Sequence, residues 1–308
     1  MTLYNETKTK NIGLQRLPMN EDIHKPVLST EVVALLDPQA GDSYLDLTAG
    51  YGGHARQVIE LIGKSGKATL VDRDINSINY LKKTIAVDKQ IEFIHSDFLM
   101  ASRALISQNK KYSCILADLG VSSPHLDNPD RGFSFMNEGP LDMRMDNSSE
   151  LTAQKIVNEY SQEALANLLY NYGELKNSRK LASIIIQNRP YNTTIELSSF
   201  IPGQFKVRMR VLAQVFQALR IEVNDELNQL KNSLELWHEL LEPDGRLAVI
   251  TFHSLEDRIV KQYFAEHANG DFTSDLIMLT KKPITAGGDE IVYNPRARSA
   301  KLRALQRK

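Results

Sequence analysis

Short apolar runs alternate with longer stretches of helical spacing through the first half of the chain. Each run is a predicted buried strand, and apolar positions three and four residues apart predict the amphipathic helices between them. The predicted strands cover residues 43–47, 67–71, 91–95 and 112–117, and helices are predicted over 53–62 and 75–85. A regular strand–helix alternation is typical of a parallel sheet with right-handed crossovers.

The alternation stops after the fourth strand. A loop rich in Asp, Pro, Gly and Phe follows over residues 125–146, and helical spacing then predicts helices over 151–172, 178–188 and 209–223. Thr193 and Glu196 have the spacing of a capping box for a further short helix. These residues therefore predict a helical insertion.

The strand–helix pattern returns near residue 225. We predict helices over 225–241 and 255–267, and strands over 246–251, 275–280 and 290–293. The expected domains are a flexible tail at 1–22, a sheet domain at 23–124 and 225–308, and an inserted helical domain at 125–224.

Composition narrows the possible classes of protein. The chain is 42% apolar and 24% charged, and no apolar run of membrane-spanning length occurs. Met1 to Glu21 has no apolar signal-peptide core, so we expect a cytoplasmic protein. Cys114 is the single cysteine, which excludes a cysteine-rich zinc site, and we predict no metal ligands. The net charge is −1, so a nucleic-acid partner needs a local basic surface, for which residues 294–308 are one candidate.

The segment after the first predicted strand reads Asp46-Leu-Thr-Ala-Gly50-Tyr-Gly52-Gly53-His54. Glycines between a strand and a helix let the backbone approach a ligand, and the helix N-terminus adds unpaired N–H groups. The spacing also fits the G-x-G-x-x-A pattern of dinucleotide sites. Asp46 would repel a pyrophosphate, however, and suits a ligand with a cationic amino group such as S-adenosylmethionine (SAM).

The other three strands of the first half also end in or beside an acidic residue, at Asp72, Asp97 and Asp118. Asp72 is placed to accept hydrogen bonds from ribose hydroxyls, and Phe98 to pack on an adenine face. Any one of these aspartates alone is as well explained as a helix cap. Together they favour a positively charged nucleoside cofactor. His54 either packs on the glycine turn or donates a hydrogen bond toward that cofactor.

The chain resembles the ribosomal small-subunit methyltransferase H family, also called MraW. The family's members use SAM to methylate N4 of a cytidine in the decoding region of 16S rRNA. The resemblance rests on Gly52-Gly-His54, Asp72-Arg-Asp74, Asp118-Leu-Gly-Val-Ser-Ser-Pro124, Arg131-Gly-Phe-Ser-Phe135, Gly139-Pro-Leu-Asp-Met-Arg-Met-Asp146, Val215-Phe-Gln-Ala-Leu-Arg220, Phe252-His-Ser-Leu-Glu-Asp-Arg258 and Asn294-Pro-Arg296. It implies a class I, Rossmann-like SAM-dependent methyltransferase with a mainly parallel sheet and an inserted helical domain.

The resemblance also implies the residues of the site. SAM contacts are expected at Gly52, Gly53, His54, Asp72, Phe98 and Asp118, and at the residue after Pro124, where many members have glutamine and this chain has His125. Asp118 and Ser122 are the expected catalytic residues, as acceptors that orient the cytosine amino group. The implied partner is 16S rRNA within the small ribosomal subunit.

The helical insertion is the predicted RNA-facing part. Phosphate contacts are expected at Lys206, Arg208, Arg210 and Arg220. Phe133 and Phe135 either stack an extruded base or tuck their loop onto the core. Cys114 lies inside an apolar strand and is expected to be a buried structural thiol, which disfavours methylation at carbon. Two other functions stay open: a nicotinamide-dependent dehydrogenase and a non-catalytic ribosome-assembly factor.

Overall fold

A seven-stranded sheet organises the computed structural model of the chain, which describes residues 26–85, 90–199, 205–268 and 274–308. The predicted tail at 1–22 lies outside the described residues. The strand order is β3-β2-β1-β4-β5-β7-β6. The strands are β1 (Ser43–Asp46), β2 (Lys67–Asp72), β3 (Gln90–His95), β4 (Tyr112–Asp118), β5 (Leu241–Thr251), β6 (Leu276–Met278) and β7 (Lys301–Arg307). All pairings from β3 to β5 are parallel, which confirms the predicted mainly parallel α/β fold.

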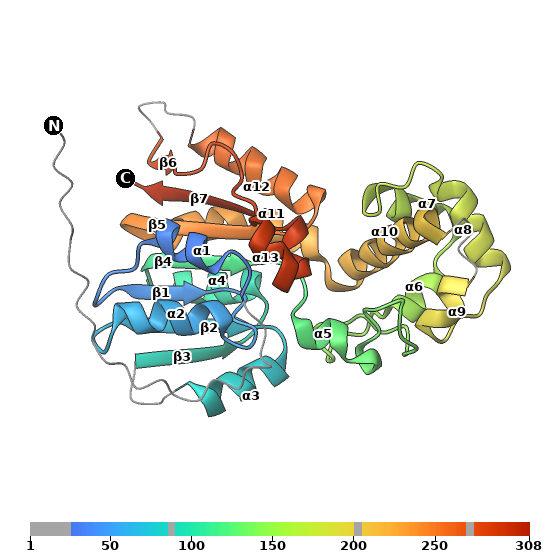
Figure 1. Ribbon diagram of the computed structural model, residues 1–308, viewed down its shortest axis with the longest axis horizontal. Coiled ribbons are helices and arrows are strands. Elements are labelled where there is room, and N and C mark those ends of the chain that lie inside the picture. Colours follow the sequence, from blue (N-terminus) through green and yellow to red (C-terminus); the bar gives the residue numbers. More distant parts are fainter. Residues whose placement is uncertain (1–25, 86–89, 200–204, 269–273) are drawn as a thin grey trace.

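Helices cover both faces of the sheet because successive strand residues point to opposite faces. Tyr44 packs on one face with α1 (Ser29–Leu36), α2 (Gly53–Ile62) and α3 (Ile75–Thr84). Its neighbour Leu45 packs on the other face, with α4 (Phe98–Ser107), α11 (Glu226–Glu239) and α12 (Ser254–His267). Figure 1 shows this layered part at the left. α1 was not predicted from the sequence.

The chain between β4 and α11 forms a second body at one side of the sheet (Figure 1). Its helices are α5 (Ser123–Asp127), the 3-10 turn η1 (Pro129–Arg131), α6 (Ala153–Glu159), α7 (Gln162–Asn171), α8 (Ser178–Gln187), α9 (Thr194–Ser199) and α10 (Phe205–Asn224). A separate apolar core holds it together, with side chains from Phe133 to Val223.

Two helices replace the single one predicted over 151–172. The chain is extended at Tyr160, and the Ser161 side chain accepts a hydrogen bond from the Ala164 amide to cap α7. The capping box predicted at Thr193 and Glu196 is present, because each side chain accepts from the other's backbone N–H.

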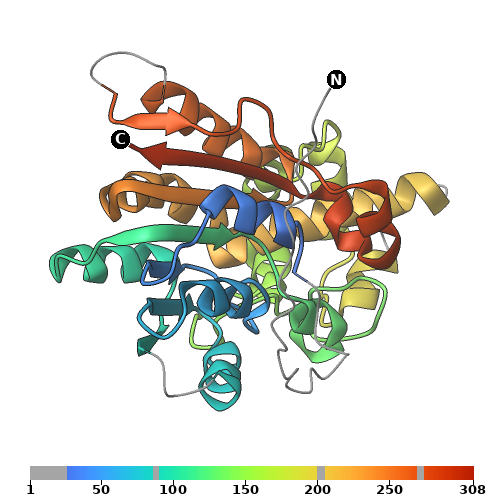
Figure 2. The same ribbon diagram turned by 60° about the vertical axis from the view of Figure 1, so that its left-hand side comes forward.

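The C-terminal part differs most from the prediction. Residues 290–293 belong to a helix, α13 (Gly288–Tyr293), and the 3-10 helix η2 (Pro295–Ser299) follows. The last strand is β7, which lies antiparallel between β5 and β6 (Figure 2). The second half of the predicted basic tail is therefore part of the sheet. Of the helices described, none combines the length and apolarity needed to cross a membrane.

Candidate active site

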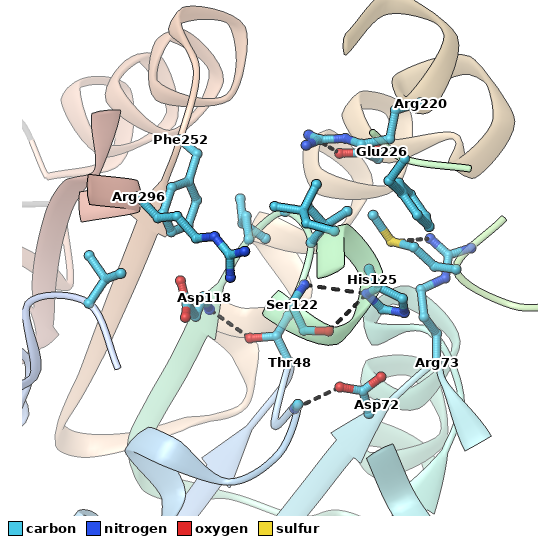
Figure 3. Close-up of a pocket in the computed structure, with 18 of the residues that line it drawn as sticks. Thr48, Asp72, Arg73, Asp118, Ser122, His125, Arg220, Glu226, Phe252 and Arg296 are labelled. Carbon is cyan, nitrogen blue, oxygen red and sulfur yellow. Dashed lines mark hydrogen bonds and ion pairs between the residues drawn. The ribbon is translucent and has the colours of Figure 1, made fainter. Parts of the chain in front are cut away.

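A cavity of about 450 Å³ opens where β1, β2 and β4 end. Its floor is formed by the turns that follow these strands. Residues of the helical body line one side of the cavity, and Arg296 of the C-terminal segment lines another (Figure 3). Of the predicted site residues, the following line it: Gly53, His54, Asp72, Phe98, Asp118, Ser122 and His125.

The glycine turn follows β1 as predicted, but its glycines act differently. Gly50 and Gly52 have φ of 51° and 82°, a region that favours glycine. A Cβ at Gly52 would lie 2.7 Å from Leu81 Cδ2, and Gly52 is not among the cavity-lining residues. Gly52 therefore allows α2 to pack on α3, while Gly53 faces the cavity.

Asp46 and Asp72 are the acidic ends of β1 and β2 and hold the glycine turn in place. Asp46 accepts hydrogen bonds from the Tyr44 hydroxyl at 2.8 Å and the Thr48 amide at 3.1 Å. Burial raises the pKa of Asp46 to about 7. Asp72 accepts from the Gly50 amide and from the Asp74 amide, both at 2.7 Å. Burial raises the pKa of Asp72 as well.

Asp118 ends β4, the strand beside β1. Its backbone N–H donates to Thr48 Oγ1 at 2.6 Å, and its Oδ2 lies 3.6 Å from His54 Nε2. Its Oδ1 is buried without a hydrogen-bond partner among the described residues. Burial raises the pKa of Asp118 well above its ordinary value, and the nearby carboxylates of Asp46 and Glu256 raise it further. Asp118 is thus a carboxyl group with free hydrogen-bonding capacity in the cavity.

The acidic residues after β2 and β3 serve as helix caps. Asp97 accepts from the Met100 amide at 2.8 Å and caps α4, although it also lines the cavity. Asp74 caps α3 through the Asn76 amide. Asp74 Oδ2 also lies 2.8 Å from His125 Nε2. Burial alone would raise the pKa of Asp74, but the hydrogen bond from His125 and the nearby Arg131 guanidinium lower it.

His125 uses both ring nitrogens on protein groups. Its Nδ1 lies 2.9 Å from Ser122 Oγ and accepts from the Ser122 amide at 3.3 Å, so its Nε2 carries the proton that is donated to Asp74. The ring therefore fixes Ser122 at the edge of the cavity (Figure 3). A contact between His125 and SAM stays a prediction.

Aromatic side chains line the cavity on two sides. Phe98 is half-buried beside the glycine turn and makes an edge contact with Trp237, with ring centroids 5.5 Å apart. Phe133 is buried against His125, and Phe135 packs edge-on against Phe216 at 5.2 Å. Phe133 and Phe135 thus both pack on the core of the helical body and line the cavity.

Sequence reasoning did not predict how the charged residues around Arg220 pair with one another. Arg220 of α10 bonds both oxygens of Glu226 at 2.8 Å, so this predicted phosphate contact is tied to a buried carboxylate. His253 caps α12, and its partner in the capping box is Glu256. Glu226, His253 and Glu256 have ligand atoms within 4.8 Å of one another. Arg220 bonds Glu226, and His253 Nε2 lies 3.1 Å from Glu256 Oε1, so both carboxylates have protein groups beside them.

Arg208 and Arg210, two of the other predicted phosphate contacts, are not among the residues that line the cavity. Arg208 donates to the Ser198 carbonyl at 2.8 Å and so holds the end of α9, whereas Arg210 is exposed. The side chain of Lys206 is outside the described part of the structure.

The sequence profile of the MraW methylase family matches residues 21–308. The chain belongs to this family. Ribosomal RNA small subunit methyltransferase H from Trichormus variabilis is 43% identical over 291 residues, which cover 92% of this chain and 92% of that protein. The protein of the same name from Halothermothrix orenii is 41% identical over 305 residues, covering 92% of this chain and 98% of that one.

Membership in the MraW methylase family confirms the resemblance inferred from the motifs, and it argues against a nicotinamide-dependent dehydrogenase. Among solved structures, a putative rRNA-methylase from Clostridium thermocellum aligns with a TM-score of 0.44 and 11% sequence identity, covering 92% of this chain and 97% of that chain. A likeness at that level says nothing further about activity.

Proposed function

We propose that the protein is a SAM-dependent methyltransferase that methylates N4 of a cytidine in the decoding region of 16S rRNA. Support comes from the MraW methylase family and from relatives named ribosomal RNA small subunit methyltransferase H. The observation that carries the chemistry is the buried Oδ1 of Asp118 at the cavity, which has no hydrogen-bond partner among the residues that the structure describes.

The floor of the cavity suits SAM, which supplies an electrophilic methyl group on a sulfonium cation when it is bound. Asp46, Asp72 and Asp118 are carboxyl groups with raised pKa, and a cation beside them favours their ionised forms. Each oxygen of Asp72 accepts one backbone hydrogen bond and keeps a lone pair for a ribose hydroxyl. Phe98 offers a flat apolar face for the adenine, and Gly53 and His54 border the same turn.

Asp118 and Ser122 are the proposed catalytic residues. The lone pair of a cytosine amino group is delocalised into the ring, so an enzyme must orient the group and accept its N–H hydrogens. Asp118 Oδ1 is a free acceptor, and Ser122 is held beside it by His125 (Figure 3). Holding two reacting atoms about 3–3.5 Å apart contributes roughly 7–11 kcal/mol.

The environment of Cys114 supports methylation at nitrogen rather than at carbon 5 of a pyrimidine. Methylation at carbon 5 requires a thiolate that adds to the ring. The Cys114 thiol is 1% exposed and donates to the Leu36 carbonyl at 3.5 Å. Burial raises its pKa to about 12, so it is a poor nucleophile. It is also the single cysteine of the chain.

We also propose that residues 125–224 form the substrate-recognition domain, inserted into a SAM-binding domain of residues 23–124 and 225–308. The aromatic wall formed by Phe133, Phe135 and Phe216 supports this division, because an extruded base stacks on such side chains.

The test is transfer of labelled methyl groups from SAM to under-methylated small ribosomal subunits, followed by nucleoside analysis. We expect label in N4-methylcytidine at one position of 16S rRNA. Asp118→Asn keeps the size of the side chain and should lower transfer by about 100-fold or more, because an amide is a weaker acceptor for the amino hydrogens. Label in 5-methylcytidine would contradict the proposal. Subunit binding without transfer would indicate the assembly factor.

A further inference from the structure

Three arginines line the cavity in the described part of the chain: Arg73, Arg220 and Arg296. Arg73 donates to the Asn224 carbonyl at 3.2 Å and so ties β2 to the end of α10. Arg220 is 15% exposed and bonds Glu226, which is 9% exposed. Separating a buried pair leaves an uncompensated charge, which costs several kcal/mol. Arg220 is therefore held by Glu226.

Arg296 differs because its acidic partner is exposed. Its Nη2 lies 2.7 Å from Asp127 Oδ1, the Arg296 side chain is 35% exposed and that of Asp127 is 67% exposed. Such a pair contributes only about 0–1 kcal/mol in water. The bond joins η2 to α5, so it connects the C-terminal segment to the first helix after β4 at the cavity.

We propose that Arg296 binds a backbone phosphate of the target nucleotide, and that Asp127 holds the guanidinium in place until RNA replaces it. A guanidinium binds phosphate through two parallel hydrogen bonds, more strongly than it binds one carboxylate oxygen near water. The proposal rests on the proposed function, since it takes RNA to be the substrate.

The position of Arg296 favours a phosphate over the carboxylate of SAM. The glycine turn and Asp46 lie on the buried floor, whereas Asp127 faces solvent, from which RNA arrives. In Figure 3, Arg296 and Phe252 lie on one side of the cavity and Arg220 with Glu226 on the other. A phosphate at Arg296 would thus place the attached base between these two walls.

Arg296→Ala provides the first test, and Arg298→Ala is its matched control. Arg298 is an exposed arginine of the same short helix and does not line the cavity. We expect Arg296→Ala to weaken binding to under-methylated small subunits by about 10-fold or more and to lower the salt slope by about 0.7. Arg298→Ala should change neither, and SAM affinity should be unchanged in both. Arg296→Lys should keep the slope and lose part of the affinity.

Asp127→Asn tests whether Asp127 competes with phosphate for Arg296 or instead links η2 to α5 structurally. If Asp127 competes with phosphate, its loss should tighten subunit binding by up to about 5-fold, the worth of an exposed ion pair. Asp130→Asn removes the same charge from an exposed position in the adjacent turn η1 and controls for general electrostatics. Weaker subunit binding in both Asp127→Asn and Arg296→Ala would indicate that the ion pair has a structural role, and it would overturn the inference.

Two further results have separate meanings. Loss of SAM affinity in Arg296→Ala would assign the guanidinium to the cofactor and overturn the inference. Failure of the wild-type protein to methylate small subunits would contradict the proposed function. An active wild type with Arg296→Ala indistinguishable from Arg298→Ala would overturn the inference alone.

Discussion

Three carboxyl groups end the three adjacent strands β2, β1 and β4. Asp72, Asp46 and Asp118 all have a raised pKa, mainly because of burial. Ionising them together in one low-dielectric site is unfavourable without a nearby cation. A bound sulfonium and amino group would offset this cost, so proton release and cofactor binding should be linked.

Asp46 should make SAM affinity depend on pH. With a pKa of about 7, Asp46 is largely protonated below neutrality and cannot attract a cation. We expect SAM affinity to fall toward tenfold per pH unit below about 7 and to level off above it. The part due to Asp46 is the difference between wild type and Asp46→Asn in calorimetric titrations from pH 5.5 to 8.5. Parallel curves for the two proteins would exclude Asp46 as the cause.

The free energy of unfolding should change with pH in the opposite direction. The carboxyl of Asp46 ionises near 3.8 when unfolded and near 7 when folded, so the unfolded chain loses its proton first. Its contribution to stability is therefore full below about pH 4 and is lost as pH rises to about 7. Tyr44→Phe removes the hydrogen bond that lowers this pKa, and should move the midpoint of the SAM titration to higher pH. An unchanged midpoint would contradict this account.

Asp72 should contribute to both binding and stability. It holds the Gly50 and Asp74 amides, so Asp72→Ala removes two hydrogen bonds to a charged group, worth roughly 1.5–3 kcal/mol each. We expect a weaker SAM complex by about 10–150-fold and also a lower free energy of unfolding. Asp72→Asn keeps an oxygen for one amide and should lose less stability. Urea unfolding without SAM separates the two effects, and full stability in Asp72→Ala would contradict the structural part.

At the scale of elements, local signals were sufficient for the strands β1 to β4 and for the glycine turn. The boundaries of α2 agree with the prediction because apolar spacing and the glycines on either side specify them. β7 was missed because Lys301-Leu-Arg-Ala-Leu-Gln-Arg307 carries the charge expected of a solvated tail. Its place depends on Asp257, 46 residues upstream, which bonds Arg303. The Arg220–Glu226 and His253–Glu256 pairs escaped prediction because only folding places them around one cavity.

Arg303 should therefore matter for stability and not for RNA. It is 5% exposed, and its Nε donates to Asp257 Oδ1 at 2.7 Å. Arg303→Ala leaves that carboxylate with Lys301, so we expect a loss of about 3–5 kcal/mol in urea unfolding. Arg298→Ala, which removes an exposed cation nearby, should cost less than about 0.5 kcal/mol. Equal free energies of unfolding for the two variants would indicate that residues 301–307 behave as a loose tail.

For the whole molecule, the net charge of −1 means that the proposed RNA substrate must be held by local cations. The sequence singled out Arg208 and Arg210 of α10, but Arg208 holds the Ser198 carbonyl, so its replacement would also loosen α9. Lys176 is the better partner for Arg210, because both are exposed and line one shallow groove of the helical body.

The pair Lys176→Ala with Arg210→Ala should therefore bind small subunits more weakly, with SAM affinity intact. Two phosphate contacts to a single strand contribute about 1.4 to the slope of log affinity against log salt, so the variant's slope should be lower by that amount. Lys82→Ala with Lys83→Ala removes the same charge from an exposed stretch of α3, which lies at the bottom of the layered part and away from α7 and α8 (Figure 1). If both double variants shift binding equally, the effect is one of net charge, and the helical body holds no RNA through this groove. A shift confined to the first pair would place the RNA along α10, on the path that leads to the aromatic wall and Arg296.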